Sequence, residues 1–186
     1  MPETKVDEPL VTPSAGHAEL VRFLERSATA WAAVTDDVDR DTLVIFGLLE
    51  ATARIWQSVH TETLAGFDLN LAEWTTLGML RISPPAFRRS PTELRRLVGQ
   101  TSAGMTRILG KLGGAGLVRR ATEPADGRRH DVILTRRGGT LAEESFGALH
   151  TTERELLRPV AAPARAGLID TLDELRDALR CDPKGR

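Results

Sequence analysis

The sequence has a single cysteine, no long apolar run and a polar start, and each of these absences excludes a class of protein. Cys181 alone cannot form an intrachain disulfide, and nothing else indicates an oxidising compartment. No apolar run approaches the roughly 20 residues that span a bilayer. The acidic, polar start MPETKVDEP does not resemble a secretory signal. We therefore expect a cytoplasmic protein without a membrane partner.

The sequence also lacks the residue patterns that are typical of catalytic and metal-binding sites. The sequence has no phosphate-binding glycine loop, nucleophile elbow or zinc-protease motif. No paired carboxylates or nucleophile–base sets stand out. The spacing of the four histidines is not that of metal ligands: His17, His60, His130 and His150. We expect neither an enzyme nor a bound metal or cofactor.

The formal net charge of −1 conceals an uneven distribution. Between Arg81 and Asp131 there are eleven positive and four negative side chains, a balance of +7 that leaves −8 for the rest of the chain. A basic block on an acidic body indicates a surface that faces phosphates. The alternative is that these arginines only solvate helix surfaces. The positive residues are Arg81, Arg88, Arg89, Arg95, Arg96, Arg107, Lys111, Arg119, Arg120, Arg128 and Arg129.

Apolar spacing and capping signals predict helices on both sides of this block. We expect a flexible tail over residues 1–13, an amphipathic helix over 14–34 and a long apolar helix over 43–64. Asn70 opens another helix, with Glu73 in capping-box position, which must stop before Pro84. Further helices are predicted from Thr135 to about residue 158 and, beyond Pro163, to about residue 180.

The segment from Ser90 to Thr135 reads as helix, turn, helix and two-stranded hairpin. Ser90 is an N-cap, with proline at the first helical position and glutamate at the third. The glycines from Gly113 to Gly116 end the second helix, where at least one is expected to be left-handed. Short strands are expected over 117–120 and 131–134, with turn formers between them. This order predicts a winged helix-turn-helix.

The second helix of this unit begins with small and polar side chains. Such residues let a backbone approach base edges closely, and their hydroxyls can bond phosphates or bases. Arg107 and Lys111 lie four residues apart on one helix face, and an arginine there can pair with guanine or neutralise a phosphate. Arg128 and Arg129 at the hairpin tip suit a narrow minor groove. The predicted DNA-binding residues are Ser90, Thr92, Thr101, Ser102, Ala103, Gly104, Thr106, Arg107, Lys111, Arg128 and Arg129.

Two alternatives stay open for these features taken singly. The helix could be an ordinary Gly/Ser-rich surface helix, and the basic tip an ordinary solvated turn.

Ile108, Leu109 and Leu112 are expected to pack into the core on the opposite side of the helix.

The run GLVRRATEPADGRRHDVILT, with Asp126, Arg128, Val132, Leu134 and Thr135 in the spacing D-x-R-x-x-x-V-x-L-T, resembles the wing of MarR-family transcriptional regulators. The preceding SPTELRRLVGQTSAGMTRILGKLGGAGLV is similar to the helix-turn-helix of that family. The resemblance covers about residues 43–179. It implies a homodimer built from the terminal helices, with one winged lobe per subunit on a pseudo-palindromic operator.

A narrower resemblance is to the urate-responsive subgroup of this family, through an added N-terminal helix with a tryptophan and the segment LNLAEWTTLGMLRISPP. It implies a ligand site at Trp31, Thr75, Arg107 and Arg120. Thr75 stands where that subgroup has an aspartate. The missing carboxylate argues against urate and leaves room for another small anionic or aromatic effector in the same cleft. The alternative for Trp31 is core or dimer packing.

The expected architecture is mainly α with a small β-hairpin wing (α+β). We assign residues 1–13 to the tail, 14–65 to N-terminal helices for dimerisation and ligand binding, 66–135 to the winged helix-turn-helix lobe and 136–186 to C-terminal dimerisation helices. The predicted function is a homodimeric, sequence-specific regulator of transcription that binds double-stranded DNA, as a repressor relieved by a ligand. The alternatives are a winged-helix protein-interaction module, or an activator without small-molecule control.

Overall fold

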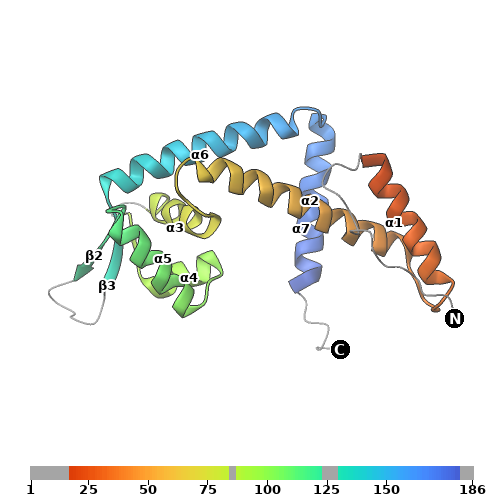
Figure 1. The fold of residues 1–186 in the computed structure, drawn as a ribbon, viewed down its shortest axis with the longest axis horizontal. Helices are drawn as coiled ribbons and strands as arrows, with labels where there is room; N and C mark the ends of the chain where they lie inside the picture. Colours follow the sequence, from red (N-terminus) through yellow and green to blue (C-terminus); the bar gives the residue numbers. More distant parts are fainter. Residues whose placement is uncertain (1–16, 84–86, 123–129, 181–186) are drawn as a thin grey trace, which may run out of the picture. The chain divides into compact units, whose positions relative to one another are not determined.

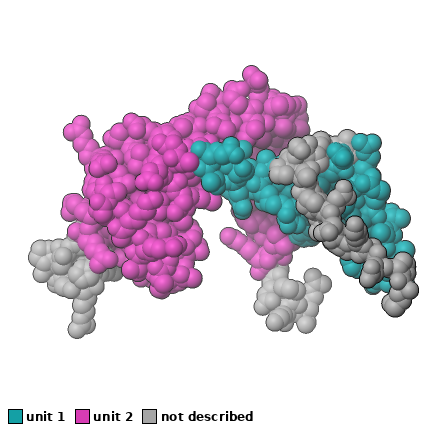
Figure 2. Space-filling model, in the orientation of Figure 1, with its two compact units in different colours: residues 1–62 teal, residues 63–186 magenta. Residues whose placement is uncertain are grey.

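The computed structural model describes residues 17–83, 87–122 and 130–180, which form helices and one small antiparallel sheet (Figure 1). The expected class, mainly α with a small β wing, is confirmed. The chain divides into two compact units, residues 1–62 and 63–186 (Figure 2). The expected tail over 1–13, the hairpin tip and Cys181 lie outside the described residues.

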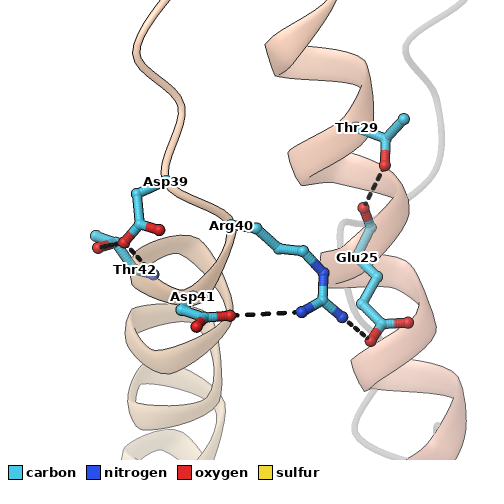
Figure 3. Close-up of polar contacts among 6 residues, drawn as sticks. All are labelled: Glu25, Thr29, Asp39, Arg40, Asp41 and Thr42. Atoms are coloured by element: carbon cyan, nitrogen blue, oxygen red, sulfur yellow. Dashed lines mark hydrogen bonds and ion pairs between the residues drawn. The ribbon is translucent and has the colours of Figure 1, made fainter.

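The first unit consists of α1 (His17–Ala32) and most of α2 (Arg40–Ala65). Leu24 packs directly over Gly47, where an added Cβ would lie 2.4 Å from a Leu24 methyl carbon, so glycine permits this close approach. Arg40 forms an ion pair with Glu25 of α1 (Figure 3). Asp39 precedes α2 and accepts hydrogen bonds from the hydroxyl and the backbone N–H of Thr42, and these bonds lower the pKa of Asp39.

The second unit holds the remaining helices and all described strands. They are α3 (Leu71–Arg81), β1 (Arg88–Arg89), α4 (Pro91–Val98), α5 (Ser102–Gly114), β2 (Val118–Thr122), β3 (His130–Leu134), α6 (Arg136–Leu157) and α7 (Ala162–Arg180). One apolar core joins α3, α4, α5, the sheet and α6. Leu77, Leu80 and Leu94 are fully buried in it.

The capping signals in the sequence start the helices where they were expected. Asn70 and Glu73 form a complete capping box at α3, and Ser90 and Glu93 form another at α4. Thr135 caps α6 by accepting from the N–H of Gly138 at 3.0 Å. The predicted left-handed glycine near the end of α5 is Gly116, with φ of 70°.

The sheet contains one strand more than the predicted hairpin. β2 pairs with β3 as expected, but β1 pairs with the other edge of β3, giving the order β1-β3-β2. The pairing is antiparallel and sets Arg88 opposite Ile133 and Arg89 opposite Val132. A two-residue strand has no alternation to recognise. β1 instead depends on tertiary contacts, including an ion pair of 3.4 Å between Arg88 Nε and Asp131 Oδ2.

Within the described ranges, none of the helices is both long and apolar enough to cross a membrane. The longest, α2, carries charged side chains along its length, such as Glu50 and Arg54, which form an ion pair.

Gly138 lets the first turn of α6 pack against the base of the wing. A Cβ at Gly138 would lie 2.1 Å from the carbonyl oxygen of Leu117, which already accepts hydrogen bonds from the N–H and the hydroxyl of Thr135. We expect Gly138→Ala to lower the free energy of unfolding by about 1–3 kcal/mol, because the backbone must shift. Gly139→Ala is the control, since its Cβ would meet only Leu134 Cδ2 at 3.8 Å. Urea titrations compare the two, and equal stability would contradict the close approach.

The α4 capping box should be sensitive to acid. Hydrogen bonds from the backbone N–H and the hydroxyl of Ser90 lower the pKa of Glu93. A lowered folded-state pKa gives stability that is present above the unfolded pKa of about 4.3 and is lost as the pH falls through the folded value. Glu93→Gln should therefore destabilise the protein at pH 7 by roughly 0.5–1 kcal/mol. The difference from wild type should shrink below about pH 4. Paired denaturation curves at both pH values measure it, and a pH-independent difference would refute the assignment.

Candidate nucleic-acid interface

The turn between α4 and α5 is built from local signals. α4 ends at Gly99, which is left-handed with φ of 67°, and Gln100 N–H then donates to the carbonyl of Arg95 at 3.0 Å. Thr101 caps α5 by accepting from the N–H of Gly104 at 3.1 Å. The chain therefore leaves one helix and enters the next within three residues, which is the geometry of a helix-turn-helix.

α5 has one buried and one exposed face. Met105, Ile108, Leu109 and Leu112 are buried, so the predicted core side of this helix is confirmed. The opposite side presents small or hydroxyl side chains at its first turns, together with one arginine. The exposed residues of this surface, which we call the α5 face, are Thr101, Ser102, Ala103, Thr106, Arg107 and Gly110.

Several hydroxyls predicted to contact DNA also serve the local fold. The Thr106 hydroxyl donates to the carbonyl of Ser102 at 3.0 Å. The Ser90 hydroxyl donates to Glu93 Oε2 at 2.8 Å and accepts from Glu93 N–H. Thr101 uses its oxygen as an acceptor in the cap, which leaves its own proton available for an external acceptor. Thr92 is exposed.

Gly104 lies under the cap, where a larger residue would crowd it. A Cβ at Gly104 would lie 3.0 Å from Gln100 Oε1 and 3.2 Å from Thr101 Oγ1. The glycine therefore preserves the cap that starts α5 and keeps the amino end of this helix narrow.

Arg107 and Lys111, predicted to act together, are placed differently. Arg107 is exposed and makes no hydrogen bond or ion pair among the described residues. Lys111 Nζ lies 3.0 Å from Glu73 Oε2 and 3.1 Å from the carbonyl oxygen of Asp68. The hydrogen bond to Glu73 raises the pKa of Lys111. Lys111 thus holds α5 to the start of α3, a role that the sequence did not reveal.

Part of the basic block is likewise used inside the protein. Arg81 Nε donates to Glu143 at 2.6 Å, Arg88 pairs with Asp131, and Arg89 Nε donates to Ser83 Oγ at 2.7 Å. Within the described part of the chain, the side chains of five arginines of the block make no hydrogen bond or ion pair: Arg95, Arg96, Arg107, Arg119 and Arg120. Arg128 and Arg129 lie outside the described residues.

The residues of the predicted ligand site are divided between the two units. Trp31 belongs to the first unit and is 58% exposed, whereas Thr75, Arg107 and Arg120 belong to the second. The Thr75 hydroxyl donates to the carbonyl of Leu71 at 2.7 Å. The four-residue ligand site stays a prediction. No group of three or more His, Cys, Asp or Glu side chains placed to hold a metal ion occurs among the described residues.

Comparison with known proteins shows what this site is similar to. The model of the MarR family matches residues 67–129, which run from the end of α2 to the wing. A solved structure of a MarR mutant from E. coli, complexed with operator DNA, is 23% identical, with a TM-score of 0.63 over 75% of this chain and 99% of that one.

Two further structures share the fold. The transcriptional repressor CouR, bound to a DNA duplex, is 23% identical, with a TM-score of 0.62 over 70% of this chain and 90% of that one. BpsR of Bordetella bronchiseptica, whose DNA binding is regulated by 6-hydroxynicotinic acid, is 19% identical. Its TM-score is 0.61 over 71% of this chain and 98% of that one.

These matches do not reach the urate-responsive subgroup, and that narrower assignment stays a prediction. The helix-turn-helix, β1 and β2 fall within the family match, and β3 follows directly after it. Residues 67–129 therefore match the MarR family, and the chain shares the fold of the MarR-family winged helix-turn-helix regulators.

Proposed function

We propose that this protein is a transcriptional regulator that binds double-stranded DNA sequence-specifically, as a homodimer on a pseudo-palindromic operator. The observation that carries the proposal is the α5 face: a family recognition helix whose exposed side bears hydroxyls, small residues and the unpaired Arg107. Small side chains permit close approach to base edges, and an arginine can pair with guanine or a phosphate. Arg119 and Arg120 on β2 extend the positive charge along the wing.

Exposed apolar side chains support the homodimer. α7 has no buried residue, and Leu168, Leu172 and Leu179 are 44–63% exposed along one stripe of that helix. A continuous exposed apolar stripe marks an interaction surface. The partner that we propose is a second copy of the same chain, because most soluble oligomers are symmetric homodimers. Two lobes related by a twofold axis would read half-sites about one helical turn apart.

Repression that a ligand relieves is the regulatory mode that we propose. Any ligand that binds one arrangement of the two lobes better than the other would change how well both α5 helices fit their half-sites. The regulation of BpsR by 6-hydroxynicotinic acid offers a precedent on the same fold. The experiment that tests the proposal starts with selection of binding sequences from random duplexes by the purified protein.

Arg107→Ala should weaken binding to the selected duplex by about 1–3 kcal/mol, because it removes a base or phosphate contact from the α5 face. Arg154→Ala is the matched control, since this exposed arginine lies near the end of α6, away from the helix-turn-helix. Fluorescence anisotropy at several salt concentrations measures both variants. Enrichment of no sequence, with equal binding by the two variants, would contradict DNA recognition and favour a protein-interaction module.

Leu172→Asp should convert the dimer to monomers, because it sets a charge in the middle of the α7 stripe. Ala166→Asp adds the same charge on the opposite side of α7 and should leave the dimer intact. Sedimentation velocity distinguishes the species, and circular dichroism checks that each variant is folded. A wild-type protein that sediments as a monomer at micromolar concentration would overturn the homodimer.

A further inference from the structure

The carboxyl end of α5 is rich in glycine. Gly110, Gly113 and Gly114 are among the last five residues of this helix. A Cβ added at any of the three would meet no heavy atom within 4 Å, and none of them has a positive φ. Packing and backbone conformation would therefore both tolerate alanine, which favours a helix more than glycine does. α5 thus ends in a segment whose own preference for the helical conformation is weak.

Lys111 lies within this segment and connects it to residues that are distant in the sequence. Its Nζ lies 3.0 Å from Glu73 Oε2, 3.1 Å from the carbonyl oxygen of Asp68 and 3.8 Å from Asp68 Oδ1. Glu73 is buried at the start of α3, and Asp68 lies between α2 and α3. One ammonium therefore joins the end of α5 to two points of the connection between α2 and α3.

The backbone at Asp68 has an uncommon conformation that suits this contact. Asp68 is left-handed with φ of 53°, which few residues other than glycine adopt and which aspartate tolerates better than most. Its N–H donates to the carbonyl of Ala65 at 3.2 Å, and the N–H of Leu69 donates to the carbonyl of Leu64 at 3.2 Å. These bonds shape the turn after α2, and the carbonyl of Asp68 accepts from Lys111.

The choice of lysine at this position is also unusual for this chain. The sequence contains 22 arginines and three lysines, and Lys111 is the one lysine within residues 17–83, 87–122 and 130–180. An ammonium is a compact charge with three donors, whereas a guanidinium is a planar fork that matches a single carboxylate. A carboxylate and a carbonyl from two different residues therefore suit lysine, which indicates a defined contact rather than general surface charge.

Apolar packing alone would leave the carboxyl end of α5 less well defined. Leu109 and Leu112 are buried there, but the hydrophobic effect that buries them has no direction. Hydrogen bonds impose both distance and angle. Because α5 is a rod of 13 residues, about 20 Å long, a shift at one end changes the direction of the whole helix.

We propose that Lys111 is a positioning residue for DNA recognition. Held by Glu73 and Asp68, it keeps the glycine-rich end of α5 helical and sets the direction in which the α5 face meets the base edges. This inference rests on the proposed DNA-binding function. The Lys111 ammonium is engaged inside the protein, so it acts through α5 and not by contact with DNA.

The proposal predicts a loss of sequence preference rather than of DNA binding in general. Contacts to base edges require donors and acceptors to be aligned, whereas attraction to phosphates depends mainly on charge. A helix whose far end is loosened should therefore discriminate less between sequences and still bind DNA non-specifically.

The test compares the affinities of the full chain for the selected duplex and for a scrambled duplex of the same composition, by fluorescence anisotropy. Lys111→Met should lower the ratio of the two affinities about tenfold, the scale of one lost base contact, and leave the affinity for the scrambled duplex nearly unchanged. Arg81→Met is the matched control, because it removes a cation of the same unit whose ion pair with Glu143 does not involve α5. Its ratio should equal that of wild type.

A second variant separates positioning from loss of stability. Lys111→Met leaves the buried carboxylate of Glu73 without its cation, which destabilises the fold. Adding Glu73→Gln removes that charge, and glutamine keeps a side-chain oxygen for the α3 capping box. The double variant should regain stability in urea titrations, but its ratio of affinities should stay low.

Alanines at the glycine-rich end provide a rescue that a purely stabilising role of Lys111 does not predict. Gly113→Ala and Gly114→Ala, added together to the double variant, should raise the ratio about threefold, because alanine strengthens the helix end. Both positions lie outside the α5 face and have open space for a methyl group. Amide hydrogen exchange at residues 110–114 should be faster in Lys111→Met than in wild type, and slower again with the alanines.

The outcomes distinguish this proposal from the proposed function. An unchanged ratio in both Lys111 variants, an equal loss of affinity for the two duplexes, or no rescue by the alanines would overturn the positioning role. A wild-type protein that prefers no duplex would refute the proposed function, and hydrogen exchange at residues 110–114 would still decide whether Lys111 holds the end of α5.

Discussion

The hydrogen-bonded ion pair between Lys111 and Glu73 links the parts of the winged unit that matter most. Glu73 is 4% exposed, and its Oε2 accepts from the backbone N–H of Asn70 and from Lys111 Nζ, each at 3.0 Å. A buried carboxylate needs such partners, because removing one leaves a charge without compensation. One carboxylate therefore completes the cap of α3 and holds the carboxyl end of α5. As a result, the position of the α5 face depends on the start of α3.

The base of the wing depends on an equally compact set of contacts. The carbonyl of Leu117 accepts from both the N–H and the hydroxyl of Thr135, and Gly138 lets α6 approach that carbonyl. β2, the cap of α6 and the first turn of α6 thus meet at one oxygen atom. Arg136 and Arg137 follow directly after this cap, so the base of the wing also fixes where α6 starts.

Local signals in the sequence were sufficient for the starts of α3, α4 and α6 and for the fold class. Asn70, Ser90 and Thr135 cap helices through residues three positions away, and such interactions can be read from spacing alone. The role of Lys111 could not be read in this way, because Glu73 is 38 residues distant and its burial is a tertiary property. β1 escaped prediction for the same reason: its pairing with β3 is created by the fold and not by any local pattern.

The basic segment shows why net charge is an incomplete guide to a DNA-facing surface. The charge balance of +7 counts every cation equally. Arg81, Arg88 and Lys111, however, form ion pairs with carboxylates of the protein itself. Arg107, by contrast, has no partner in the described part of the chain and lies on an exposed helix face. Arg136 and Arg137, outside the segment, carry the same signature. An arginine that makes no ion pair within the protein keeps its guanidinium available to an external anion, whereas a paired one does not. By that criterion the α5 face, with Arg107, is the part of the basic segment that we propose meets DNA.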